Sequence, residues 1–449
     1  MGDADGGQTA QVESRNGGAR WSPGVRPGAP GSRATRLELY YDVVFVFAFL
    51  NVTTLAATYA SVQSVVRCLL VLALLWWCWS GFALLGNTVR TDQGFVPLVG
   101  FATIAAAFLL ALTMPEAFTD RPGGLPGPLV FAGCYFLVRA CQVGVLGWVA
   151  RADPRLRRQW LLSGLPVVVA TALLVVAGLV PQRLADDSAE AGLRLGLWLA
   201  AVAVEYRVGL VLRGVVSPLV SVGHWAERHA QIILVALGET VIALGLGPKF
   251  ITDLPLTWAV VLAAVGGVAV VSVLWWAYFD SLALAVEQAL HRTRDSDARI
   301  ALTRDAYTYL HLPMIAGIIF FALGLKGLLT DVADPSTPRW GNPLTRFDLL
   351  TIYGGVAIYL LALGALALRA LRQVRGVPLA AAVLIIVLMP VAGRLPALVA
   401  LALLALVCVL MAAAQVVTEA PHRRRVRQVA LEEQLAAEAE QSEWRRRHL

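Results

Sequence analysis

Ionisable side chains inside long apolar runs are the residues of this sequence that could do chemistry. The stretch HWAERHAQIILVALGETVIALG, from His224 to Gly245, places Glu239 well inside such a run. If the run crosses a membrane, a charge at its centre costs on the order of 3 kcal/mol, so the side chain must face other helices and find a partner there. Other residues of this kind are Glu38, Asp42, Arg139, Glu205, Glu227, Arg228, Asp280 and His311.

Helical spacing groups several of these residues on common faces. Glu38 and Asp42 are four positions apart and therefore share one face of a helix. His224, Arg228 and Glu239 also share a face if their helix begins early in the stretch. Close to the end of a span, a charged side chain can reach water and serve only as an interface anchor. This alternative applies to Glu38, Glu227, Arg228 and His229.

Three charged residues are expected near the middle of the membrane, namely Arg139, Glu205 and Glu239. Arg139 matches Glu239 in depth and has the opposite charge, and Glu205 competes for the same arginine. Residues at this depth typically belong to an ion or proton pathway. The alternative is a static buried ion pair that holds two helices together.

A second group lies in the cytoplasmic half of the predicted spans and consists of Asp42, Asp280 and His311. A polar cavity that opens toward the cytoplasm would explain all three. Trp276 shares a helical face with Asp280, and Tyr307 shares one with His311.

Composition places these residues in an integral membrane protein. The chain has 449 residues, of which 58% are hydrophobic and 15% are charged, and its mean hydropathy is +0.69. Soluble domains contain about 25% charged residues. The net charge of +7 is typical of cytoplasmic loops in membrane proteins, so we expect no nucleic-acid partner. The five cysteines are odd in number and lie in apolar runs, which argues against a disulfide framework.

The apolar runs predict an all-α fold, a polytopic bundle of about twelve transmembrane helices, since a bilayer requires about 20 residues per helix. The final run is interrupted by GRLP at 393–396, because proline cannot continue a helix. The predicted spans are 37–58, 64–86, 95–117, 128–150, 160–180, 191–213, 229–247, 254–283, 306–329, 347–369 and the two parts of 378–416. Lysine and arginine concentrate in alternate loops, which predicts a multi-pass protein of the cell membrane with both termini in the cytoplasm.

The two halves of the chain share several features. Acidic residues open the first and seventh spans, and tryptophan pairs occur in the second and eighth. These features predict two six-helix repeats in the same orientation, 37–213 and 214–416. Residues 1–36 are predicted to form a disordered cytoplasmic arm. Residues 417–449 are predicted to form a charged cytoplasmic helix, which either lies near anionic headgroups or has a solvated face.

Four motifs identify a family resemblance. The stretches ELYYDVVFVFAF, HWAERHAQIILVALGETVIA, WWAYFD and YTYLHLPMIAGI resemble the bacterial low temperature requirement A (LtrA) family of polytopic membrane proteins, over roughly 33–415. The first motif departs slightly from the family pattern, because a Tyr pair stands where a Phe pair is expected. The resemblance implies that the family's features fall on Glu38, Asp42, Glu227, Arg228, Gly238, Glu239, Asp280 and His311. The family name describes a growth phenotype and implies no reaction.

Function remains open between several classes of protein. HExxH, GxSxG and P-loop motifs are missing from the sequence, and the spacing of the histidines is poor for a shared metal, so we expect no metal and no cofactor. The buried carboxylates and arginine favour a transporter or channel that is embedded in the lipid bilayer and moves a proton or a small cation across it. The alternatives are a membrane-embedded enzyme that acts on a lipid or isoprenoid, because tryptophan faces can stabilise cations, and a scaffold without turnover.

Overall fold

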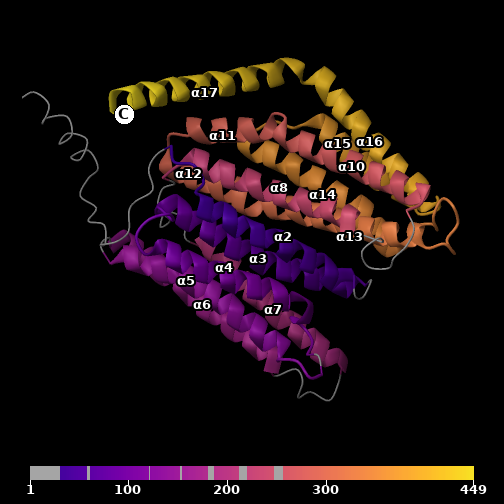
Figure 1. Ribbon diagram of the computed structural model, residues 1–449, viewed down its shortest axis with the longest axis horizontal. Helices are drawn as coiled ribbons and strands as arrows, with labels where there is room; N and C mark the ends of the chain where they lie inside the picture. Colours follow the sequence, from indigo (N-terminus) through magenta and orange to yellow (C-terminus); the bar gives the residue numbers. More distant parts are fainter. Residues whose placement is uncertain are drawn as a thin grey trace, which may run out of the picture.

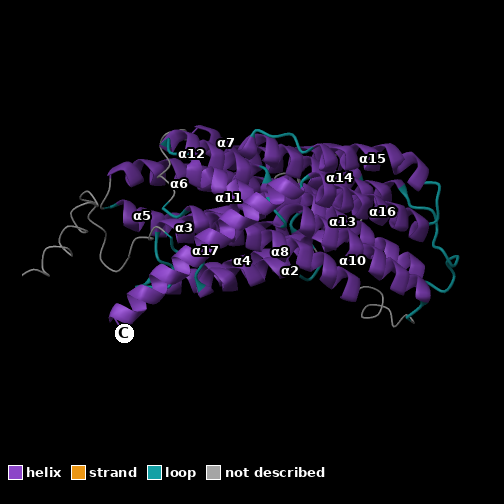
Figure 2. Ribbon diagram, turned by 90° about the horizontal axis from the view of Figure 1, so that it is seen from above, coloured by secondary structure: helices purple, strands orange, loops and turns teal. Residues whose placement is uncertain are grey.

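The computed structural model describes residues 31–57, 61–120, 122–151, 154–179, 187–211, 220–246 and 256–448. Within these ranges the regular structure is helical, as predicted (Figures 1 and 2). The first group of helices is α2 (Arg36–Ala57), α3 (Val62–Thr88), α4 (Val96–Thr113), α5 (Gly127–Ala150), α6 (Pro154–Leu179) and α7 (Asp187–Val211). The second group is α8 (Val222–Leu246), α10 (Trp258–Phe279), α11 (Leu282–Arg292), α12 (Ser296–Thr303), α13 (His311–Ala333), α14 (Arg346–Leu371), α15 (Gly376–Ala392), α16 (Ala397–Thr418) and α17 (Ala420–His448).

The described residues contain ten helical segments that are long and apolar enough to cross a membrane. Helix α15 is apolar but has only 17 residues, and α7 carries charged residues along its length. In its described part, each predicted span falls on one of these helices, except that the eighth is shared by α10 and the start of α11. The prediction of a polytopic helical membrane bundle is therefore confirmed.

Two helix boundaries differ from the prediction in ways that affect the buried charges. Helix α8 begins at Val222 and not at residue 229, because the Ser221 hydroxyl caps it by accepting a hydrogen bond from the His224 N–H. The eighth predicted span is divided into α10 and α11 at Ser281. Before α13, residues Arg304–Tyr309 form a π-helix.

Helix α2 lies at the centre of the bundle. It packs against α3 and α4 on one side and against α8 and α13 on the other. Figure 1 shows α3 to α7 together below α2, and α8 with α10 to α16 above it. The side chains at this junction are large and fully buried, including Trp76, Trp79 and Tyr41.

Helices α13 and α14 approach closely through small residues. A Cβ atom at Gly317 would lie 2.5 Å from the Gly355 carbonyl oxygen, and one at Gly355 would lie 2.7 Å from the Gly317 carbonyl oxygen. Small residues allow such backbone contact between membrane helices, where lipid offers no hydrophobic driving force. This contact fixes α13, which carries His311.

Helix α17 follows α16 and crosses the end of the bundle at which α11 and α12 lie, called here the α12 end (Figures 1 and 2). Its side chains from residue 431 to residue 447 are exposed. The predicted N-terminal arm lies outside the described residues up to position 30, and so does the boundary predicted at 213.

Candidate functional site

Three polar contacts join α2 to α8 along one line, called here the α2–α8 seam. Glu38 meets His224, Asp42 meets Arg228, and Thr53 meets Glu239. In all three contacts the two residues are 186 positions apart. A constant offset means that the two helices run parallel and in register. His224, Arg228 and Glu239 were predicted to share one face if their helix begins early. Helix α8 does begin early, and all three side chains lie on the face that meets α2.

The contact closest to the α12 end is between Glu38 and His224. The His224 Nε2 atom lies 2.9 Å from a Glu38 carboxylate oxygen, and the Thr35 backbone N–H and hydroxyl donate to the other oxygen. The Asn87 Oδ1 atom accepts a backbone N–H from Val220 at 2.9 Å, so the Asn87 amide nitrogen faces His224 Nδ1. The Asn87 amide nitrogen donates to His224 Nδ1, so the His224 hydrogen is on Nε2 and is donated to Glu38.

One turn further along the seam, Asp42 and Arg228 form an ion pair with two hydrogen bonds. The guanidinium nitrogens donate to the two carboxylate oxygens at 2.5 and 2.9 Å, and the Trp79 indole N–H donates to Asp42 at 2.8 Å. Arg228 also lies 3.8 Å from Glu38 and over the Trp79 ring. Both Glu38 and Arg228 are fully buried. The interpretation of these two residues as interface anchors is therefore wrong, because neighbouring helices cover them.

An aromatic cluster lies beside this ion pair and contains His229 and His311. The rings of Trp76, Trp79, Trp225 and Tyr307 surround His229. The His311 ring lies 5.2 Å from that of His229 and stacks on Tyr307.

The π-helix explains how His311 is oriented in this cluster. Its Nδ1 atom donates to the Ala306 carbonyl at 2.9 Å, and its Nε2 atom accepts from the Tyr278 hydroxyl at 2.9 Å. π-helical turns are frequent at functional sites. The rings of Trp79 and His229 connect Asp42 with His311, so His311 belongs to the same buried region.

Glu239 lies in the part of the seam away from the α12 end. It is 11 residues beyond Arg228, which corresponds to about 16 Å along the helix. Its side chain is fully buried, and one oxygen lies 3.2 Å from the Thr53 hydroxyl. Its other oxygen has no partner among the described residues. Because α8 begins earlier than predicted, Glu239 is displaced from the middle of the span toward this end.

Arg139 and Glu205 form a separate buried ion pair between α5 and α7, with 3.3 Å between nitrogen and oxygen. The Tyr135 hydroxyl also donates to Glu205, and Arg139 donates to the Gln142 side chain at 2.7 Å. The sequence left two carboxylates open as partners of Arg139. The structure selects Glu205, and the pairing of Arg139 with Glu239 is wrong.

Asp280 lies at the end of α10, away from the seam. Arg423 and Arg427 of α17 both donate to its carboxylate, and the Arg423 guanidinium lies over the Trp276 ring. The predicted cavity shared by Asp280, Asp42 and His311 is therefore wrong, because Asp280 is occupied by the C-terminal helix.

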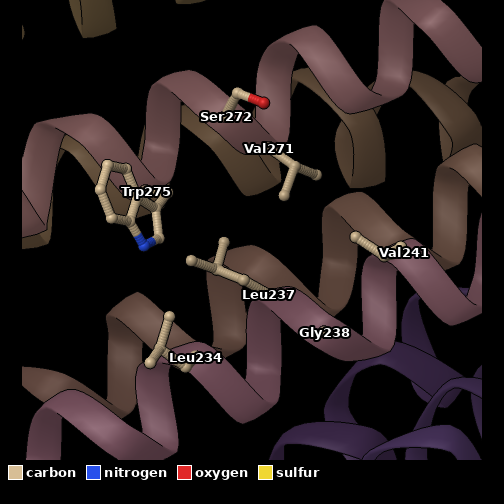
Figure 3. A pocket seen from close by; sticks show the side chains of 7 residues that line it. All are labelled: Leu234, Leu237, Gly238, Val241, Val271, Ser272 and Trp275. Atoms are coloured by element: carbon tan, nitrogen blue, oxygen red, sulfur yellow. The ribbon is translucent and has the colours of Figure 1, made fainter.

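The remaining family positions have peripheral roles in this structure. Glu227 is partly buried and accepts the Ala34 backbone N–H at 3.1 Å. Gly238 faces away from the seam and lines a groove of about 300 Å³ between α8 and α10 (Figure 3). The groove is open and apolar, with Trp275 and Ser272 as its polar groups.

The structure adds residues that the sequence reasoning did not single out. Thr53, Trp79 and Asn87 each bind a charged or titratable partner through long-range hydrogen bonds. Polar residues within apolar runs are a usable signal, but their partners are on other helices and spacing alone cannot find them. Within the part of the chain that the structure describes, no three His, Cys, Asp or Glu side chains are grouped as a metal site would require.

The apolar helices and the charges enclosed between them define a multi-pass helical membrane protein. The chain belongs to the bacterial low temperature requirement A (LtrA) protein family, whose model matches residues 33–413. It is also similar to an uncharacterized protein of Rhizobium meliloti (strain 1021), with 26% identity over 305 residues, which cover 65% of this chain and 69% of the relative. No solved structure gives a significant match.

Proposed function

We propose that this protein is a transporter whose path follows the α2–α8 seam. The observation that carries the proposal is the arrangement of buried polar contacts along one parallel helix pair at the centre of the bundle. A buried charge is costly in a membrane and is typically retained where a substrate, ion or proton is bound. The seam has two polar levels, one with Glu38 and Asp42 and one with Glu239. Because each level carries a carboxylate, the substrate class that fits best is a proton or a small cation.

The apolar segment between the two levels supports an occluded path. Phe45 and Phe49 of α2 and Ile232 of α8 are fully buried between the Asp42–Arg228 pair and Glu239. The 11-residue step from Arg228 to Glu239 along α8 separates the two polar levels by about 16 Å. Transport would require these side chains to separate while the polar levels exchange access.

The packing of the helices supports the repeat that such a transporter would use. Helix α2 packs on α3 and α4, as α8 packs on α10 and α13. The series α4, α5, α6 and α7 packs in sequence, as α13, α14, α15 and α16 do, and α3 contacts α7 as α10 contacts α16. On this basis we propose two six-helix repeats related by an axis along the membrane normal, with α2 and α8 as equivalent helices at their junction.

The charge distribution of the loops supports the cell membrane as the location, with the α12 end in the cytoplasm. Both termini lie on that side in this proposal. The polar level with Glu38, His224, Asp42 and Arg228 then faces inward.

Transport can be tested with the full chain reconstituted in liposomes. The flux of protons, Na⁺ and K⁺ would be followed under an imposed pH gradient. We expect flux above that of protein-free liposomes, lost in Asp42→Asn and retained in the matched control Asp334→Asn, which changes an exposed loop residue. Parent protein that moves none of these ions would overturn the proposal.

A membrane-embedded enzyme remains the second candidate, and the aromatic cluster around His229 is the observation that favours it. Trp76, Trp79 and Trp225 present ring faces that could stabilise a cationic intermediate. Incubation of the same liposomes with lipid and isoprenoid substrates, followed by mass spectrometry of the products, separates the two functions.

A further inference from the structure

Glu239 differs from the other buried carboxylates of the described residues. Those at positions 38, 42, 205 and 280 each have an arginine or histidine within ion-pair distance. Glu239 has none within that distance, although it is fully buried. Lys326 of α13 acts on it electrostatically but makes no ion pair with it. An ionised carboxylate at this place would be exceptionally poorly compensated.

The hydrogen bonds of Thr53 give an independent argument. The Thr53 hydroxyl lies 2.8 Å from the Leu50 carbonyl oxygen and 3.2 Å from the Glu239 carboxyl oxygen. A hydroxyl has one hydrogen, and a carbonyl can only accept. The single Thr53 hydrogen lies between two acceptors, and the shorter distance favours the Leu50 oxygen. A proton on Glu239 would supply the hydrogen of the longer contact, with Thr53 as its acceptor.

We infer that Glu239 and Thr53 form a proton-binding site, and that Glu239 holds the proton in this structure. The protonated carboxyl donates to Thr53, while its other oxygen, which has no partner among the described residues, is a neutral carbonyl that tolerates burial better than a carboxylate does. The ligand of this site is a proton. Its use in a transport cycle rests on the proposed function, whereas its presence does not.

The closing experiment measures protonation directly and needs no transport activity. Infrared difference spectra of the full-length protein in liposomes at neutral pH would compare the parent with Glu239→Gln, Thr53→Val and Thr54→Val. We expect the C=O stretching band of a protonated carboxyl to be lost in Glu239→Gln. The band should shift in Thr53→Val, which removes its hydrogen-bond acceptor, and stay unchanged in Thr54→Val. Thr54 is the matched control, because it is the exposed neighbour that also bonds to the Leu50 carbonyl.

Two results would overturn the inference. One is the loss of ionised carboxylate bands, and not of an acid band, in Glu239→Gln. The other is an acid band in the parent that Thr53→Val leaves unchanged, which decides the question even if Glu239→Gln fails to fold. A protein that shows the expected spectra but no ion flux would overturn the proposed transport and leave the proton site intact.

Discussion

Neutralising Glu205 should destabilise the protein strongly, because it leaves Arg139 charged and buried. The side chains of Arg139 and Glu205 are 8% and 1% exposed, so solvent screens this pair very little. In Glu205→Gln, Arg139 keeps its hydrogen bond to Gln142 but loses its counter-charge. Breaking a buried pair from one side typically costs about 3–5 kcal/mol, and we expect a loss in this range.

The double variant Arg139→Met/Glu205→Gln separates the cost of leaving one buried charge unpaired from the interaction free energy of the ion pair. Replacing both partners removes the buried charge, so the loss should be smaller than the sum of the two single losses by about 1–3 kcal/mol. The free energy of unfolding would be measured by SDS titration in mixed micelles. Arg207→Gln is the matched control, because Arg207 is exposed on the same helix and should change stability by less than about 0.5 kcal/mol. Losses that simply add would show that the two charges do not interact.

Three further predictions follow from other contacts. Gly86→Ala should lower the free energy of unfolding by about 1–3 kcal/mol, because its Cβ would lie 2.6 Å from the Glu38 carboxyl carbon; Gly144→Ala, which meets nothing within 4 Å, is the control, and equal stabilities would contradict the packing. A cysteine replacing exposed Ser296 should be protected from an impermeant thiol reagent in intact cells, while one replacing exposed Ser336 should be labelled, in a background without native cysteines; the reverse pattern would invert the proposed topology. Asp280→Asn should raise the rate of tryptic cleavage at the start of α17 at least about tenfold, which corresponds to 1.4 kcal/mol of lost local stability; cleavage as slow as in the parent would show that α17 is held by other contacts.

The fold was largely predictable because the membrane imposes a simple rule. A membrane-spanning segment must form all its backbone hydrogen bonds internally, which requires a helix, and it must contain about 20 apolar residues. A run of high hydropathy in the sequence therefore predicts a spanning helix. The boundary of α8 was missed because it depends on Ser221 as a cap, and the residues just after it, including Arg228, look too polar for a span. Their partners on α2 and α3 make them compatible with burial.

The candidate site was predictable as a set of residues but not as a set of contacts. Charge and depth were enough to single out Arg139, Glu205 and Glu239. They could not assign the pairs, because the packing of the helices decides which side chains meet, and Arg139 of α5 meets Glu205 two helices further along the chain, on α7. Asp280 was misplaced for the same reason, since its partners are 143 and 147 residues away on α17.

The polar contacts between α2 and α8 are unequal along the length of the seam. At the α12 end, separation of the two helices would break an Asp–Arg ion pair and a Glu–His hydrogen bond. At the other end it would break a single 3.2 Å hydrogen bond. If the two proposed repeats moved about a hinge, the pivot would lie near Asp42 and Arg228. The two helices would then separate first at the end that carries Glu239. In such a motion the hydrogen bond between Thr53 and Glu239 would break first, so a change in the protonation of the Glu239 carboxyl would alter how easily the two helices separate there.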